Sequence, residues 1–137
     1  TQKGEIKVWQ SQPEDEADLV NWVNQYLQNY YRKKYQWQKN LGEELKKLAS
    51  ILHIDEILQQ IPKHCDKLIL IPHTVLHLFP LHALPVTNQN NQDSCCFLDV
   101  FPGGVSYAPS CQILQQVQQR EHTEFQSQFA IQNPTED

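Results

Sequence analysis

The amino-acid sequence predicts an α/β fold, in which a helical lead-in over residues 1–62 is followed, over residues 63–137, by part of a mixed sheet. Three observations predict it: helical spacing of apolar side chains in the first part, a continuous apolar run at residues 68–71, and further short apolar segments separated by turn residues. A chain of 137 residues has the length of one domain built around one core.

The lead-in is expected to contain three helices. In residues 14–38 large apolar side chains recur every three or four positions, which places them on one helix face. They are Leu19, Trp22, Val23, Tyr26, Leu27, Tyr30 and Tyr31. Pro13 and the three acidic residues after it are typical of a first helical turn. The same spacing predicts a second helix over residues 41–52, and a short third helix over residues 55–61 ends before Pro62.

The second part changes to the pattern of a sheet. Residues 68–71 form a β-branched apolar run that stops at Pro72, which predicts a strand buried on both faces, as in parallel or mixed sheets. We then expect a strand over residues 74–79, a tight turn or single helical turn over residues 80–84, and a polar loop over residues 86–94.

Beyond the loop, strands are expected over residues 97–101 and 105–108, on either side of a Pro-Gly-Gly break. Ser110 is expected to act as the N-cap of a helix. The buried side of that helix would consist of Ile113, Leu114 and Val117. A polar linker over residues 121–126 and a strand over residues 128–132 follow. Because no covering helix follows this strand, the sheet is expected to be incomplete at its C-terminal end.

Charge and composition argue against two classes of partner. The 11 Lys and Arg residues against 16 Asp and Glu give a net charge of −5, and we find no basic run, so nucleic-acid binding is not expected. No apolar stretch reaches the roughly 20 residues that cross a bilayer, and residues 1–10 lack a signal-peptide core, so no membrane partner is expected. The absence of methionine indicates a processed piece or a fragment.

The cysteines indicate the compartment. Their spacing is not that of a disulfide framework, and reduced thiols in the cytoplasm are the expectation. They are Cys65, Cys95, Cys96 and Cys111.

Two groups of residues are of types that can bind a metal or act as a nucleophile. His73, His77 and His82, together with Cys65, are of the types that bind zinc, but their spacing does not favour a site, and we expect histidines hydrogen-bonded inside a packed hairpin. Cys111 follows the expected N-cap and is the best candidate for a nucleophile, yet a small buried hydrophobic role is favoured. The residues therefore assign no catalytic, cofactor-binding or metal site.

Three ordered segments nevertheless match a known pattern. Residues 68–85 read LILIPHTVLHLFPLHALP, an apolar strand into Pro followed by Leu-His-x-x-Pro-x-x-Ala-Leu-Pro. Residues 105–110 read VSYAPS and residues 129–134 read FAIQNP. In this order the segments resemble the markers of the CHAT domain, a caspase-related cysteine protease domain often associated with TPR repeats. The resemblance covers residues 63–137, and the preceding helices are similar to the helical lead-in of these domains.

The resemblance implies a caspase-like mixed sheet and, for the whole protein, a cysteine endopeptidase of bacterial signalling. In the family pattern the catalytic histidine and cysteine each follow a strand beyond the segment similar to residues 129–134. His73, His77, His82 and Cys111 match structural positions, so no catalytic residue is carried over to this chain. The chain is then expected to be a non-catalytic portion that supports an active site completed by a downstream segment or a second subunit. The resemblance also makes TPR repeats a candidate partner.

Two alternatives stay open. The chain could be a non-enzymatic interaction module, or an inactive pseudoprotease scaffold, that docks through an exposed aromatic helix face. That face would consist of Trp22, Tyr26, Tyr30 and Tyr31. A small metal-binding protein using the three histidines of residues 73–82 is the other alternative.

Overall fold

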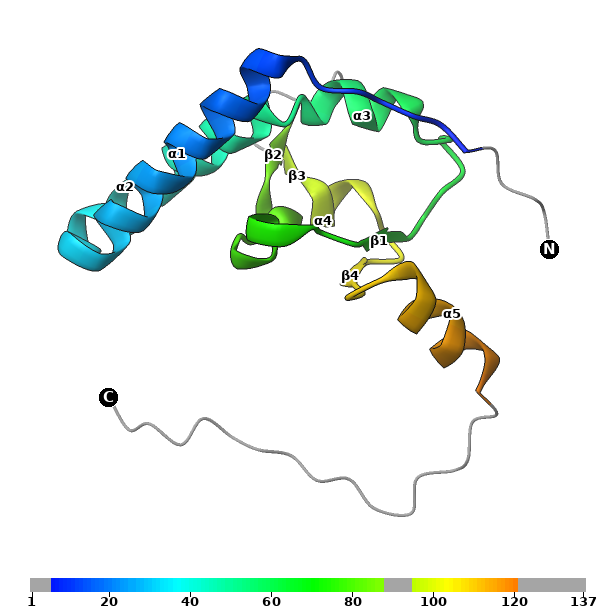
Figure 1. Cartoon of the computed structure of the whole chain (residues 1–137). Coiled ribbons are helices and arrows are strands. Elements are labelled where there is room, and N and C mark those ends of the chain that lie inside the picture. Colours follow the sequence, from blue (N-terminus) through cyan, green and yellow to red (C-terminus); the bar gives the residue numbers. More distant parts are fainter. Residues whose placement is uncertain (1–5, 88–94, 121–137) are drawn as a thin grey trace.

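The structure, a computed structural model, describes residues 6–87 and 95–120. It combines helices with two small sheets, which confirms the α/β class at this coarse level (Figure 1). The α-helices are α1 (Pro13–Arg32), α2 (Lys34–Ile51), α3 (Ile54–Gln60), α4 (Phe97–Val100) and α5 (Cys111–Gln119), and the 3₁₀ helices are η1 (Thr74–Leu78) and η2 (Leu81–Ala83). The strands are β1 (Leu68–Leu70), β2 (Pro85–Val86), β3 (Cys95–Cys96) and β4 (Val105–Tyr107).

Helices α1 and α2 form an antiparallel hairpin whose free end extends away from the sheets (Figure 1). The two helices were expected, but the first one does not continue to residue 38. It breaks at Lys33, whose backbone has φ −139° and ψ 49°. The reason lies in packing: the Trp37 ring stands edge-on to Tyr26 and Tyr30, with centroid distances of 5.7 and 5.0 Å. Folding α2 back onto α1 buries more aromatic surface than a straight helix would.

The third helix is confirmed within one residue. It ends before Pro62, and His53 precedes it in the left-handed region, with φ 49° and ψ 44°. This conformation ends α2 and begins α3, and it is uncommon for a residue other than glycine.

The strand predicted at residues 68–71 is confirmed as β1, and it pairs in parallel with β4, as Leu68 opposite Val105 and Leu70 opposite Tyr107. The ladder continues past both strands, because the Ala108 N–H donates to the Leu70 carbonyl oxygen at 2.9 Å. The prediction that this strand is buried on both faces was wrong among the described residues, since Ile69 is 36% exposed.

Two predicted strands are helices. The segment expected as a strand at residues 74–79 forms η1 with Phe79 as its C-cap, and the segment at residues 97–101 forms α4 with Phe101 as its C-cap. The short strand β3 precedes α4 and pairs antiparallel with β2. Short apolar segments fit either structure, and here the Phe97–Phe101 spacing of four residues puts two buried rings on one side of a helical turn. The predicted turn at residues 80–84 is confirmed as η2.

Ser110 caps α5 as predicted, because its Oγ accepts the Ile113 N–H at 3.2 Å. The prediction of a buried side was wrong for two of its three residues: Ile113 is 45% and Val117 49% exposed. The loop expected over residues 86–94 was wrong at its first residue, because Val86 belongs to β2. Residues 88–94 of that loop, the linker over residues 121–126 and the strand over residues 128–132 lie outside the described residues.

A single aromatic cluster joins the hairpin to the sheets. The Phe79 ring, 3% exposed, lies 4.9 Å from Trp22 and 5.1 Å from Tyr26, measured between centroids. The buried core that surrounds it includes Leu45, Leu48, Ile54, Leu81, Leu84, Val86, Phe97 and Phe101. The lead-in and the segment after residue 62 therefore share one core. Among the described residues, no helix combines the length and the apolar character that crossing a membrane requires.

Candidate functional site

The two marker segments that lie within the described residues meet at a hydrogen-bonded junction. Strand β4 places Tyr107 beside η2, where the His82 backbone N–H donates to the Tyr107 hydroxyl oxygen at 2.9 Å. His82 Nδ1 lies 2.9 Å from the same hydroxyl, and the two rings stand perpendicular with centroids 5.8 Å apart. The hydroxyl can accept the backbone bond and donate to Nδ1 when the imidazole carries its proton on Nε2.

This junction lies at the carboxyl end of the parallel pair. The chain leaves β1 through the buried Pro72 and leaves β4 through the buried Ala108. Sites of α/β proteins lie outside the carboxyl ends of their strands, so this is the position where the fold would present functional side chains. Ile71, 37% exposed, and Tyr107, 45% exposed, leave apolar surface at this end of the sheet.

The histidines do not form the expected packed hairpin. His73, the N-cap of η1, and His77 within η1 are exposed. Of these three histidines, only His82 has a side-chain partner among the described residues. The hairpin was wrong because η1 is helical, so these side chains do not alternate across a strand. Within residues 6–87 and 95–120, no three His, Cys, Asp or Glu side chains lie together as a metal site would require.

The four cysteines carry free thiols. Cys111 is exposed at the first position of α5, so its interpretation as a buried hydrophobic residue was wrong. Burial raises the pKa of the Cys95 thiol, which makes it a poor nucleophile at neutral pH. Neither position combines a thiol with a histidine partner in the described structure.

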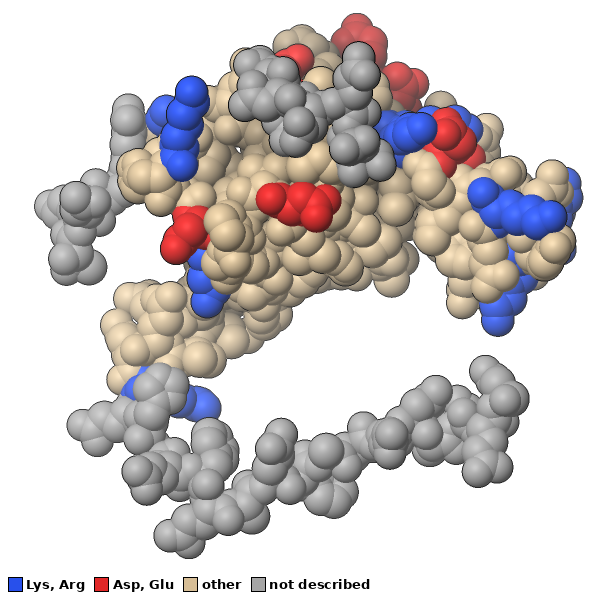
Figure 2. Space-filling model, turned by 180° about the vertical axis from the view of Figure 1, so that it is seen from behind, with Lys and Arg blue, Asp and Glu red and all other residues tan. Residues whose placement is uncertain are grey.

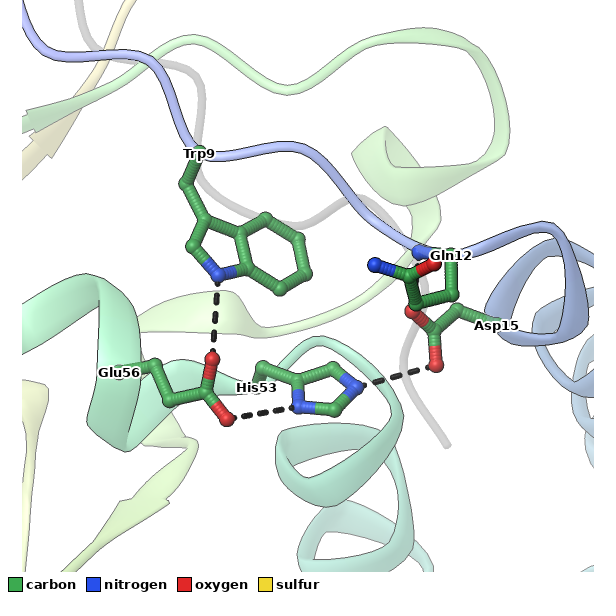
Figure 3. A network of polar contacts seen from close by, with 5 residues as sticks. All are labelled: Trp9, Gln12, Asp15, His53 and Glu56. Carbon is green, nitrogen blue, oxygen red and sulfur yellow. Dashed lines mark hydrogen bonds and ion pairs between the residues drawn. The ribbon is translucent and has the colours of Figure 1, made fainter.

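A second polar site, which the sequence did not indicate, joins the start of α1 to the start of α3 (Figure 3). His53 Nε2 lies 3.0 Å from Asp15 Oδ1, and His53 Nδ1 lies 3.2 Å from Glu56 Oε1. The Trp9 indole N–H donates to Glu56 Oε2 at 3.2 Å, and the Trp9 and His53 rings have centroids 5.3 Å apart. Asp15 Oδ2 also accepts the Gln12 backbone N–H at 2.7 Å.

His53 and Asp15 each shift the pKa of the other group. The hydrogen bond from Asp15, followed by the one from Glu56, raises the pKa of His53 above its ordinary value. The hydrogen bonds from His53 and from the Gln12 backbone lower the pKa of Asp15. The contact between His53 and Asp15 therefore stabilises the charged form of each group.

An open groove of about 370 Å³ lies next to His53. Lys46 and Ser50 from α2, Asp55 from α3 and Thr87 after β2 contribute to its lining. At this groove Asp55 joins α3 to the segment after β2, because its carboxylate accepts hydrogen bonds from the Thr87 backbone N–H at 2.8 Å and from the Thr87 hydroxyl at 2.7 Å. The groove does not include the His82–Tyr107 junction, so the described structure holds two separate polar sites.

Sequence signals for these sites existed only in part. The spacing His53-x-x-Glu56 at the start of a helix is a local signal for one contact of the network. Asp15 and His53 are 38 positions apart, and His82 and Tyr107 are 25 apart, so their pairing depends on the tertiary fold. No family model, no curated protein and no solved structure matches the chain.

Proposed function

We propose that residues 63–137 are the front, non-catalytic portion of a caspase-like CHAT domain, and that they support an active site whose histidine and cysteine come from another segment or subunit. The observation that carries this proposal is the junction of the two marker segments: β1 and β4 pair in parallel, and Tyr107 bonds to His82 at the carboxyl end of the pair. Two of the segments that carry the sequence resemblance are therefore in contact in the structure.

The exposure of the sheet supports the same proposal. Parallel strands are normally covered on both faces, yet Ile69, Ile71 and Tyr107 are between 36% and 45% exposed here. A further strand or helix against this pair would cover that apolar surface. In the proposed function, the cover belongs to the segment that completes the protease site.

The first experiment compares two proteins. The reading frame downstream of Asp137 is sequenced, and a strand followed by His-Gly and a later strand followed by Cys are sought. If they are present, the longer protein should cleave a peptide library, whereas the chain of 137 residues should not. Activity of the isolated chain that disappears in Cys111→Ala would contradict the proposal, as would a longer frame without either residue.

A second candidate function is a non-enzymatic interaction module. One observation favours it: Tyr31 is 78% exposed and Tyr30 39% exposed near the free end of the hairpin. The docking face expected from sequence was wrong in part, because Trp22 and Tyr26 are buried in the core at 5% and 7% exposure. An interaction through the hairpin would therefore use a different side of α1.

A further inference from the structure

The outer face of α1 carries a seam of six exposed residues. They are Glu14, Asp18, Asn21, Gln25, Gln28 and Arg32. Their spacing of four, three, four, three and four residues places them along one line of the helix. The buried Val23 lies opposite this line, whereas the buried Trp22 and Tyr26 lie to one side of it. The seam is wholly polar, so it does not belong to the core of the chain.

The charges of this seam lie only at its ends. Glu14 and Arg32 are eighteen positions apart, which is five helical turns, so both project from the same side of α1 about 27 Å apart. No charged residue occurs between Asp18 and Arg32. In Figure 2 a group of blue Lys and Arg side chains lies at the free end of the hairpin, at the right of the view.

The seam is complementary to itself when two copies run antiparallel. A two-fold axis near position 23 places Glu14 opposite Arg32 of a second copy, and Arg32 opposite Glu14 of that copy, at the same time. The same operation sets Asp18 against Gln28 and Asn21 against Gln25, and each of these pairs can hydrogen-bond. A parallel arrangement would instead place like charges together at both ends.

We infer that α1 is a self-association surface, on which a second copy of this chain binds antiparallel through the seam from Glu14 to Arg32. Since the seam has no apolar side chain, the complex is transient and sensitive to salt rather than obligate. Polar residues at such positions fix orientation and register at a cost in affinity. The inference depends on α1 alone, so it holds or fails independently of the protease proposal.

Charge exchange tests it on the full chain. Sedimentation equilibrium should show concentration-dependent dimers at low salt that weaken at high salt. Glu14→Arg and Arg32→Glu should each weaken the association constant about tenfold, because every reversal puts two like-charged contacts into the symmetric interface. An equimolar mixture of the two variants should recover association, and so should the double variant Glu14→Arg/Arg32→Glu.

The controls separate pairing from helix stability. Glu16 is also exposed in the first turn but lies on another side of α1, so Glu16→Arg should leave association within about twofold of the wild type. The double variant opposes the helix dipole at both ends, so recovery in it cannot come from a more stable helix. Circular dichroism verifies folding, and Glu14→Gln replaces Glu14→Arg if that variant unfolds. A monomer at all concentrations, equal loss in Glu16→Arg, or failure of the double variant to recover would overturn the inference.

Discussion

The Tyr107 hydroxyl lies 2.9 Å from both the backbone nitrogen and Nδ1 of His82. One hydroxyl thereby connects β4 to η2, although β2, β3 and α4 lie between these two segments in the sequence. Removing this oxygen leaves the ring in place, so its contribution can be measured alone.

Tyr107→Phe should lower the free energy of unfolding by about 1 kcal/mol, because a hydrogen bond at a partly exposed site contributes about 0.5–1.5 kcal/mol. Urea denaturation monitored by circular dichroism measures it. The control is Tyr35→Phe, since Tyr35 is 72% exposed and its change should have almost no effect. Equal effects of the two changes would mean that the junction contributes nothing specific.

Phe79→Ala should destabilise the chain by about 3–5 kcal/mol, because the ring is 3% exposed and packs on both Trp22 and Tyr26. The neighbouring Leu78 is 65% exposed, and Leu78→Ala should change the stability by less than about 0.5 kcal/mol. Tryptophan fluorescence and far-ultraviolet circular dichroism should report one common transition in the wild type. Two separate transitions would contradict a shared core.

Alanine substitutions at Gly103 and at Gly42 should change the stability of the chain in opposite directions. A Cβ at Gly103 would lie 2.7 Å from the Asp66 carbonyl oxygen, to which the Gly103 N–H also donates, so Gly103→Ala should cost about 1–3 kcal/mol. At Gly42, within α2, a Cβ meets no described atom within 4 Å, and Gly42→Ala should stabilise the chain by about 0.5–1 kcal/mol. Thermal unfolding of both variants checks the prediction, and a stabilising Gly103→Ala would be inconsistent with the close approach.

The His53 network predicts how stability depends on pH. The pKa of His53 is raised in the folded chain, so its contribution is complete below the unfolded value of about 6.5 and disappears as the pH rises through the folded value. The pKa of Asp15 is lowered, so its contribution is complete above about 3.8 and disappears as the pH falls through the folded value. The network should therefore stabilise most between about pH 4 and 6.5.

Denaturation at a series of pH values, compared between the wild type and His53→Asn, measures this dependence. Asparagine tolerates the left-handed backbone of residue 53, so the variant removes the imidazole with little added strain. The stability difference between the two proteins should shrink as the pH rises from 6 to 9. A difference that stays constant over this range would show that the imidazole does not act through its charge.

Much of the fold could be predicted from local patterns, and the failures have local causes. Helical spacing identified α1 and α3, and the β-branched run identified β1, because these segments are long or strongly patterned. The segments at residues 74–79 and 97–101 were mistaken for strands, because six and five residues hold too few repeats to distinguish the helical period from the strand period.

Tertiary contacts decided the remainder. The break at Lys33 depends on the packing of Trp37 against Tyr26 and Tyr30. Whether Ile113 is buried depends on the residues that pack against α5, and local spacing does not specify them. The His53 network joins two separate segments, residues 9–15 and residues 53–56, and no local spacing encodes the contact with Asp15. From the sequence, the candidate site could be recognised only as two marker segments. The contact between these segments could not be predicted.

Because a single residue connects α1 and α2, the chain can tolerate few insertions or deletions at this connection. Lys33 alone connects the two helices, and Trp37 follows it by only four positions. One inserted residue at this connection would turn α2 by about 100° about its axis and displace it by about 1.5 Å, which would carry the indole away from both tyrosines. Length changes should therefore be tolerated poorly at this bend, even though it is among the most exposed parts of the described structure.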